Sequence, residues 1–191
     1  LKFNFNIEDL NTIDKSLVLL RDLDIPLYNK YTLLHLDEKW IFNDYIQSYK
    51  SIEPESEQSL LKFVEQLVLK TNNDVFISTG ILPNRLTYFL KNRFIKKQNN
   101  FYELNIRDKK IFLFDNLDFL SLEKLILFSN LFISCHGAAT HVAASFNIKI
   151  IDIIDKSEKV FFNKWTSHFR KYHQLDRADF SKLTLNIIEL I

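Results

Sequence analysis

The chain has no methionine, one cysteine and two glycines among its 191 residues. A single cysteine cannot form a disulfide within the chain, and such sparing use of cysteine is typical of a reducing compartment. The 25 basic and 24 acidic residues leave a net charge of +1, which gives no overall attraction to nucleic acid or to an anionic membrane. No apolar run approaches the roughly 18–20 residues that a membrane span needs. Because natural chains begin with methionine, we expect the sequence to be a fragment of a longer protein.

What the chain does contain is a regular alternation of apolar runs and helix-like segments. Apolar runs of strand length recur five times, at Tyr31–Leu36, Val75–Thr79, Ile111–Phe114, Leu131–Ser134 and Lys149–Ile154. Helical periodicity or capping residues mark the segments Asn11–Leu23, Glu57–Lys70, Asn84–Lys97, Ser121–Ser129 and Phe180–Ile191. Irregular structure is expected at Ile41–Ser56 and Lys156–Arg177. Strands that alternate with helices favour a parallel sheet. We therefore predict an α/β fold, a Rossmann-like doubly wound parallel sheet of about five strands.

The segment Leu131–Ile154 carries the strongest functional pattern. It reads LFISCHGAATHVAASFNIKIIDII, which indicates a strand, a tight turn, a helix of small residues and a second strand. Gly137 lies in the turn, and Gly80 also follows an apolar run. Glycine is needed where the backbone takes positive φ or approaches a ligand closely. A helix that begins after such a turn presents free N–H groups and a positive dipole end, which suit a phosphate. Two interpretations stay open: a nucleotide-diphosphate pocket, or an ordinary turn that binds nothing.

The predicted sheet also places the loops that could form a site. Ligands of open parallel sheets bind beyond the carboxyl ends of the strands. The residues expected along that edge are His35–Trp40, Thr79–Leu82, Asp115–Asp118, Cys135–His141 and Asp155 onward. We therefore expect one site that combines residues from several of these loops.

Three stretches, taken in order, carry a resemblance to a known family. They are Asn11–Pro26 (NTIDKSLVLLRDLDIP), Leu33–Trp40 (LLHLDEKW) and His136–Lys149 (HGAATHVAASFNIK). The chain resembles the C-terminal, donor-binding half of a GT-B glycosyltransferase of the lipopolysaccharide heptosyltransferase type (glycosyltransferase family 9). The family motif D-[ST]-G-P-x-H-x-A-A-A-L-G-x-P matches this chain at His141 and at the alanines 143 and 144. His136 stands for the motif's Asp, Gly137 for its Ser or Thr, and His35-Leu36-Asp37 for the family's H-P-G turn, which indicates a divergent member.

The resemblance implies a division of the chain and an activity. Residues 1–30 would be a linker helix region from a preceding N-terminal domain, and residues 31–191 a Rossmann-like nucleotide-sugar-binding domain with a C-terminal helix. The implied enzyme transfers a sugar from a nucleotide-sugar to a glycan or lipid-linked acceptor, with no metal and no other cofactor. The acceptor site and the general base would belong to the N-terminal domain, so the catalytic residues are unknown and the fragment alone is expected to be inactive. The expected location is cytoplasmic, and for a lipid-linked acceptor peripheral to the membrane at its inner face.

Eight residues are candidates for contact with the nucleotide-sugar. They are His35, Lys39, Gly80, His136, Gly137, Ala138, Thr140 and His141. His136 could donate to a diphosphate oxygen or a sugar hydroxyl, or be a surface turn histidine. Lys39 would bring positive charge to the diphosphate, or be a solvated lysine. Thr140 could contact phosphate or cap the helix, and His141 could contact ligand or be a satisfied buried histidine.

Other functions remain as alternatives at this stage. A nucleotide-sugar epimerase of similar architecture and a non-catalytic partner-binding module are both compatible with the pattern. Cys135, at a strand-to-helix turn, could be the nucleophile of a cysteine hydrolase, but bulky Ile133 occupies a position that such an elbow needs small. His136 and His141 lie five residues apart, whereas helical metal-ligand pairs need a spacing of four, so no metal site is predicted. The basic and aromatic segment Lys156–Arg177 could close over a nucleotide, dock another domain or be a solvated face, and no RNA-binding motif is present.

Overall fold

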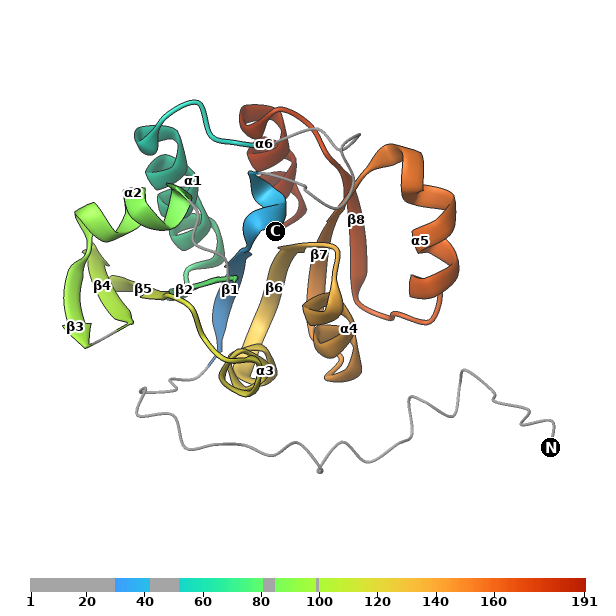
Figure 1. Ribbon diagram of the computed structural model, residues 1–191, viewed down its shortest axis with the longest axis horizontal. Coiled ribbons are helices and arrows are strands. Elements are labelled where there is room, and N and C mark those ends of the chain that lie inside the picture. The colour runs from blue at the N-terminus through green and yellow to red at the C-terminus, as the bar shows by residue number, and fades with distance from the viewer. Residues whose placement is uncertain (1–29, 42–51, 81–84, 99) are drawn as a thin grey trace.

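The computed structural model describes residues 30–41, 52–80, 85–98 and 100–191, which form an α/β fold around one open sheet (Figure 1). The strands are β1 (Tyr31–Leu36), β2 (Val75–Thr79), β3 (Ile95–Gln98), β4 (Phe101–Ile106), β5 (Lys109–Phe114), β6 (Ser129–Cys135), β7 (Lys149–Ile154) and β8 (Tyr172–Asp176). Their order across the sheet is β3-β4-β5-β2-β1-β6-β7-β8. β3, β4 and β5 pair antiparallel, and the strands from β5 to β8 are parallel. Counted in chain order, the six parallel strands lie in the order 3-2-1-4-5-6, which is that of Rossmann domains.

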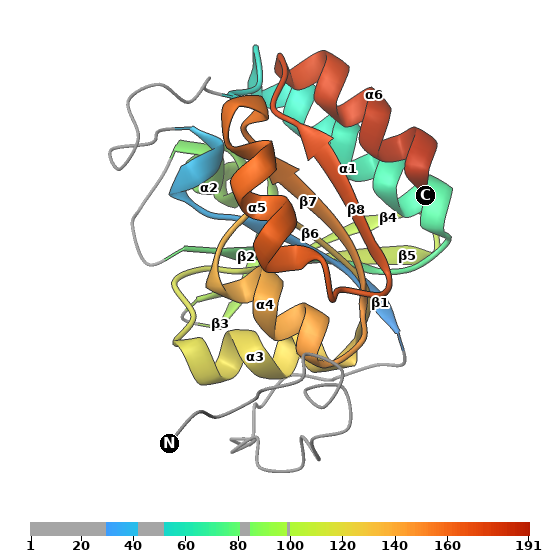
Figure 2. The same cartoon turned by 90° about the vertical axis from the view of Figure 1, so that its right-hand side faces the viewer.

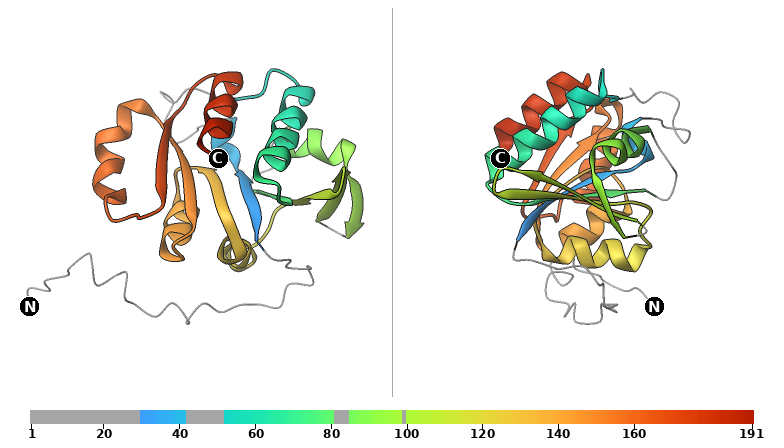
Figure 3. Two further views of the ribbon diagram at one scale, coloured as in Figure 1. Left: turned by 180° about the vertical axis from the view of Figure 1, so that it is seen from behind. Right: turned by 90° about the vertical axis from the view of Figure 1, so that its left-hand side faces the viewer.

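Helices cover both faces of this sheet (Figures 2 and 3). One face carries α1 (Glu57–Thr71), α2 (Arg85–Arg93) and α6 (Phe180–Leu190), and the other carries α3 (Phe119–Phe128) and α4 (Ala138–Ser145). α5 (Lys159–Thr166) lies beside the edge strand β8, and two short 3-10 helices, η2 (Glu38–Trp40) and η3 (Lys156–Glu158), follow β1 and β7. Within the described ranges, no helix combines the length and the apolar character needed to cross a membrane.

The alternation of side chains along the strands produces two cores. On β1, Leu34 and Leu36 face the core under α1, α2 and α6, whereas Tyr31 and Leu33 face the core under α3 and α4. In the second core Phe76 stacks on Tyr31 with ring centroids 3.7 Å apart. Full burial of such a side chain stabilises the fold by about 1.5–3 kcal/mol. Burial on both faces therefore fixes the register of the parallel strands and the place where each one ends.

The sequence pattern predicted the central part of this architecture. All five expected strands are present and parallel, as β1, β2, β5, β6 and β7. The helix expected at Glu57–Lys70 is α1, and Ser56 caps it by accepting a hydrogen bond from the backbone N–H of Ser59 at 3.1 Å. The terminal helix is α6. The helix expected at Asn11–Leu23 lies outside the described residues, as does most of the loop expected at Ile41–Ser56.

The prediction of one helix over Asn84–Lys97 is wrong at its C-terminal end, because the last residues of this segment form a strand. α2 ends at Arg93, and Ile95–Gln98 form β3. Phe94 is buried and its N–H still donates to the Leu90 carbonyl at 3.1 Å, after which the chain pairs with β4. Antiparallel pairing with β4, the next segment of the chain, overrides the helical propensity of this lysine-rich stretch. The sequence pattern did not predict β4 either.

The prediction that Lys156–Arg177 is irregular is also wrong. This segment forms η3, α5 and β8, and β8 adds a sixth parallel strand next to β7. On α5 the ring of Phe162 packs on His136, whereas Val160, Phe161 and Trp165 are exposed. α5 is only eight residues long, so it offers barely two turns of the apolar period from which a helix is predicted.

Positive φ was one of two possible reasons proposed for the glycines in the sequence analysis, and the structure does not bear this out. Neither glycine has a positive φ, and Gly137 is extended at φ 175°. Asparagines at the ends of elements, Asn72, Asn116 and Asn147, take left-handed conformations instead. The second reason, close approach of the backbone, concerns the site described next.

Candidate functional site

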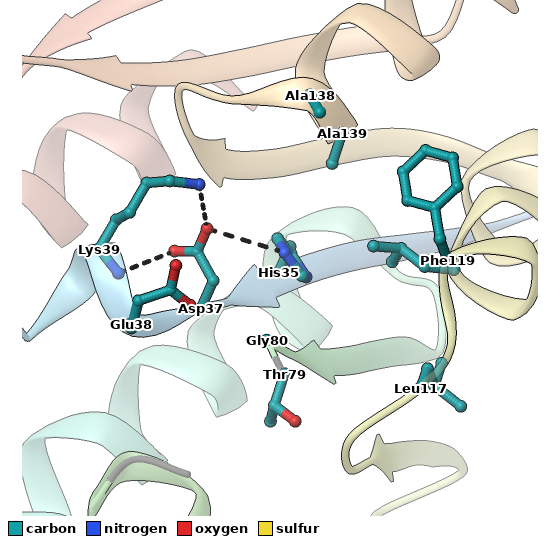
Figure 4. A pocket seen from close by; sticks show the side chains of 11 residues that line it. His35, Asp37, Glu38, Lys39, Thr79, Gly80, Leu117, Phe119, Ala138 and Ala139 are labelled. Atoms are coloured by element: carbon teal, nitrogen blue, oxygen red, sulfur yellow. Dashed lines mark hydrogen bonds and ion pairs between the residues drawn. The ribbon is translucent and has the colours of Figure 1, made fainter. Parts of the chain in front are cut away.

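A pocket of about 400 Å³ lies at the carboxyl ends of β1, β2 and β6, where the strand order reverses (Figure 4). In open α/β sheets this reversal is where ligands bind. Its lining residues are His35, Asp37, Glu38, Lys39, Thr79, Gly80, Leu117, Phe119, Leu122, Ala138 and Ala139. The pocket therefore combines the loops after β1, β2 and β5 with the first residues of α4.

The loop after β1 places an ion pair in this pocket. Asp37 begins η2 and accepts a hydrogen bond from the backbone N–H of Lys39 at 3.2 Å. The ammonium of Lys39 returns to the same carboxylate, with Nζ 2.6 Å from Oδ2 (Figure 4). Burial alone would lower the pKa of Lys39, but the charge and hydrogen bond of Asp37 raise it above its ordinary value. Arg177 also donates to the carbonyl of Lys39. Lys39 is therefore charged and oriented in the pocket.

His35 lies at the centre of the pocket but is built into the fold. It is 6% exposed, and its Nδ1 is 2.9 Å from Oγ of Ser78. Its carbonyl accepts a hydrogen bond from Nε1 of the buried Trp40 at 2.8 Å. Burial lowers the pKa of His35 below its ordinary value, with a smaller opposing effect of Asp37. His35 is therefore neutral at pH 7 and forms part of the pocket floor.

Both glycines lie where a side chain would press on the charged loop. A Cβ built on Gly137 would lie 2.7 Å from Nζ of Lys39, the end of a flexible side chain. A Cβ on Gly80 would lie 2.6 Å from Oε2 of Glu38 and 3.1 Å from Cβ of Asp37. The backbones after β2 and β6 thus approach the loop after β1 closely. This contact explains the glycines without positive φ.

The pocket also has an apolar wall formed by Leu117, Phe119 and Leu122. Figure 4 shows Leu117 and Phe119 across the pocket from the charged loop. Leu117 lies in the loop after β5, and Phe119 and Leu122 lie on α3. This loop is held to β2, because Oγ1 of Thr79 donates to Asp115 at 3.0 Å. The side chain of Phe119 is 52% exposed, so its ring is accessible from the pocket that it lines. The pocket thus has one apolar end and one end with an acidic pair and a lysine.

A second polar cluster lies on the other side of the α4 N-terminus, centred on Asp152 of β7. This carboxylate is fully buried and accepts hydrogen bonds from Nδ1 of His136 at 2.6 Å and from the hydroxyl of Tyr172 at 2.6 Å. The hydroxyl of Thr140 donates to its other oxygen at 3.2 Å. Thr140 also accepts from the backbone N–H of Gly137 at 3.3 Å. This last contact is a capping role for Thr140, which is 0% exposed.

Aromatic rings enclose the histidines of this cluster. The ring of His136 packs on Phe162 of α5 with centroids 4.2 Å apart and meets His141 edge to face at 5.3 Å. His141 in turn contacts Phe169 at 5.2 Å. Burial, followed by the neighbouring charge of His136, lowers the pKa of His141. The basic and aromatic segment therefore forms ordered structure, and its helix α5 packs against His136 through Phe162.

The structure divides the eight candidate residues between these two places. The pocket contains His35, Lys39, Gly80 and Ala138 in its lining and has Gly137 against Lys39. His136, Thr140 and His141 belong to the cluster on Asp152 and do not line the pocket.

Sequence reasoning gave no binding role to Asp37, Glu38, the apolar wall or Asp152. The signal for Asp152 was present, because a carboxylate within the apolar run IIDII must find buried partners. Its partner Tyr172 lies 20 positions away, on a strand that was not expected.

The arrangement around Cys135 does not favour a hydrolase. The thiol is 2% exposed, and burial raises its pKa, which opposes formation of the thiolate. Nη1 of Arg177 lies 3.6 Å from Sγ. The nearby carboxylate of Asp152 is bonded to His136, Thr140 and Tyr172.

Among the described residues, no group of three or more His, Cys, Asp or Glu side chains is placed to hold a metal ion. Comparison with known proteins found no family model that matches the chain and no curated protein that matches it.

Proposed function

We propose that this chain is the donor-binding domain of a glycosyltransferase that moves a sugar from a nucleotide-sugar to a glycan or lipid-linked acceptor. The observation that carries the proposal is the pocket itself. It lies where the strand order reverses, with the first residues of α4 on one side and the loop of Lys39 on another. A helix N-terminus and a charged lysine are what a leaving diphosphate needs for electrostatic stabilisation.

The two ends of the pocket suit the two ends of a nucleotide. The apolar wall of Leu117, Phe119 and Leu122 offers a surface for the base. Glu38, at the acidic end, offers carboxylate oxygens to the hydroxyls of a ribose or sugar, as acidic residues do in other Rossmann domains. Ala138 and Ala139 are small, so phosphate oxygens can reach the backbone N–H groups of α4.

The ammonium of Lys39 is bound to Asp37. It also lies so close to the backbone of Gly137 that a side chain at position 137 would collide with it. A diphosphate on the first turn of α4 would therefore lie beside Lys39 and compete with Asp37 for it. The acceptor and the general base would come from another part of the full protein, so binding without transfer is the expected property of this chain.

Calorimetric titration with uridine and adenosine diphosphates tests the proposal. Lys39→Met should weaken binding roughly 10- to 150-fold, because a charge-assisted hydrogen bond contributes about 1.5–3 kcal/mol. Lys164→Met, at an exposed lysine of α5, is the matched control and should leave binding unchanged. Absence of binding with every nucleoside diphosphate, or equal losses in both variants, would refute the proposal.

A partner-binding module without catalysis is the second candidate, and one observation favours it. α5 exposes three large apolar side chains, Val160 (74%), Phe161 (53%) and Trp165 (57%). The rings of Phe161 and Trp165 lie side by side with centroids 6.1 Å apart, and contiguous exposed apolar side chains mark interaction surfaces. Retention of a binding partner by the protein, together with an empty pocket in the titrations above, would support this function instead.

A further inference from the structure

The helix α5 has an inner side that fastens it to the rest of the fold. Phe162 packs on the ring of His136 with centroids 4.2 Å apart. Thr166 is buried, and its hydroxyl accepts a hydrogen bond from the side-chain amide of Gln174 on β8 at 3.3 Å. These contacts hold α5 in place through its inner side alone, beside the edge of the sheet (Figures 1 and 2).

The outer side of α5 carries large apolar side chains in two rows. Side chains four positions apart lie next to each other on a helix, which places Lys164 beside Val160 and Trp165 beside Phe161. Val160 is 74% exposed, Phe161 53% and Trp165 57%, and the rings of the last two lie 6.1 Å apart. The fold therefore leaves a contiguous apolar surface in water at the edge of the molecule.

Basic side chains surround this apolar surface. Positions 156 to 173 hold five basic residues and one acidic residue, whereas the whole chain is nearly balanced, with 25 basic and 24 acidic residues. The acidic residue, Glu158, is partly buried, and all five basic residues are exposed. They are Lys156, Lys159, Lys164, Arg170 and Lys171. The segment around α5 thus combines an excess of positive charge with exposed apolar side chains.

α2 is also rich in basic residues, but there the charges are compensated. Arg85 forms an ion pair with Glu53, and Nε of Arg93 lies 2.8 Å from Oε1 of Glu57. Lys91 of the same helix pairs with an aspartate at the end of β5. A basic sequence alone therefore does not distinguish α5 from α2; the excess of charge beside apolar side chains does.

We propose that the outer side of α5 binds the surface of an anionic lipid bilayer. The basic side chains would lie at the headgroup phosphates, while Phe161 and Trp165 enter the boundary between headgroups and acyl chains, where aromatic side chains are favoured. A stable protein interface buries about 800 Å² on each partner and requires a matching shape. A bilayer requires no matching shape, and it accepts a two-turn helix that protrudes at the edge of the molecule.

Lipid binding by α5 goes beyond the proposed function and does not depend on it, because none of these residues lines the pocket. The family resemblance implied a place at the membrane only through a lipid-linked acceptor, and it assigned no surface to that contact. α5 supplies such a surface whether or not a nucleotide binds in the pocket.

Sedimentation with phospholipid vesicles tests the charge requirement. The protein should bind vesicles of phosphatidylcholine that contain about 30% phosphatidylglycerol, and pure phosphatidylcholine vesicles at least 10-fold more weakly. Salt at about 0.5 M should release the protein from the anionic vesicles, because it screens the headgroup charge.

Trp165 reports whether the apolar side chains enter the bilayer. The chain has two tryptophans, and the other, Trp40, is fully buried. Anionic vesicles should therefore shift the tryptophan emission to shorter wavelengths through Trp165 alone. Trp165→Phe keeps an aromatic ring at the surface, so it should retain vesicle binding and abolish the shift.

Substitutions at exposed positions separate α5 from the rest of the surface. Phe161→Gln should weaken binding to anionic vesicles roughly 10-fold, and Leu185→Gln, at an equally exposed apolar residue of α6, should not. Lys156→Gln should weaken it roughly fivefold, and Lys182→Gln, at an exposed lysine of α6, should have no effect.

Three results would overturn the proposal. They are equal affinity for neutral and anionic vesicles, an emission spectrum that does not shift on vesicle binding, and unchanged affinity in Phe161→Gln. Binding of an acidic protein to α5 in the absence of any binding to anionic vesicles would overturn it as well, in favour of a protein partner.

Discussion

The Nζ atom of Lys39 donates to Oδ2 of Asp37 across 2.6 Å, so the cation of the pocket already has a partner in the free protein. If the proposed function holds, a ligand phosphate would compete with this carboxylate for the lysine. The Lys39 side chain is 31% exposed and that of Asp37 4%, which makes the pair partly screened by solvent. The pair therefore orients Lys39 in the pocket.

Replacement of Asp37 by asparagine tests this competition. Asp37→Asn keeps the cap of η2 but removes the negative charge, so nucleoside diphosphate binding should become tighter by roughly two- to fivefold. Calorimetry at a fixed, moderate salt concentration measures the change. Glu53→Gln is the control, because Glu53 pairs with Arg85 away from the pocket lining. Weaker binding in Asp37→Asn than in the parent protein would contradict the competition.

The two glycines should respond differently to a side chain. Gly137→Val displaces the flexible end of Lys39, so it should weaken diphosphate binding while changing the free energy of unfolding by less than about 0.5 kcal/mol. Gly80→Ala presses on Cβ of Asp37 as well as on Glu38, so it should destabilise the fold by about 1–2 kcal/mol. Denaturant unfolding of both variants measures the difference. A larger loss of stability in Gly137→Val than in Gly80→Ala would contradict this prediction, because it would mean that the loop after β1 moves aside more easily than the Lys39 side chain.

The strands that the sequence predicts and those that it does not differ in burial. β1, β2, β6 and most of β7 are buried on both faces, and such strands read as continuous apolar runs. β4 and β8 are only partly buried, and β3 contains Ile95 at 62% exposure and two exposed lysines, so their sequences look like loops. β4 and β8 are set by pairing with β5 and β7, and β3 by pairing with β4, and the apolar pattern of each segment alone does not contain these pairings.

The same limit applies to the site. Lys39, Gly80 and Gly137 could be found because glycine spacing and strand ends indicate the carboxyl edge. The separation of His136 from the pocket could not, because it depends on Asp152 and on β8, which brings Tyr172 to the carboxylate. The apolar wall depends on the bond between Thr79 and Asp115, which joins residues 36 positions apart.

Thr32 offers a test of the buried core that is independent of ligands. Its Oγ1 is fully buried, and no residue in the described part of the chain gives it a hydrogen bond. Thr32→Val removes the unsatisfied hydroxyl with little change of shape, so it should stabilise the fold by about 1 kcal/mol. Thr184→Val is the comparison, because Thr184 donates to the Phe180 carbonyl at 2.9 Å and its loss should not stabilise. Equal effects in thermal or denaturant unfolding would argue against an unpaired Thr32.

The buried histidine of the pocket predicts how stability depends on pH. Burial lowers the pKa of His35 below its ordinary value of about 6.5, and the pKa of His141 is lowered in the same direction. Below pH 6.5 the unfolded chain binds protons that the folded chain does not, so the free energy of unfolding should fall as the pH falls. His35→Gln should reduce this slope between pH 6.5 and 5 in denaturant titrations. A slope that is unchanged in the variant would show that His35 does not contribute.

Cys135 should behave as a buried side chain with no catalytic role. Because it is 2% exposed and burial raises its pKa, iodoacetamide should modify it only as fast as the protein opens, and rapidly in denaturant. Cys135→Ala in the full-length protein should keep sugar transfer nearly intact. Fast alkylation of the folded protein, with loss of activity in Cys135→Ala, would favour the cysteine hydrolase.

The most direct test of the central claim is a titration of the ¹⁵N-labelled protein with uridine diphosphate, followed in backbone amide spectra. We predict saturable shifts at Lys39, Gly80 and Gly137–Ala139, and at Phe119 on the apolar wall, with little change on α6. Shifts that avoid these residues, or none at millimolar nucleotide, would contradict the assignment of this pocket to a nucleotide-sugar.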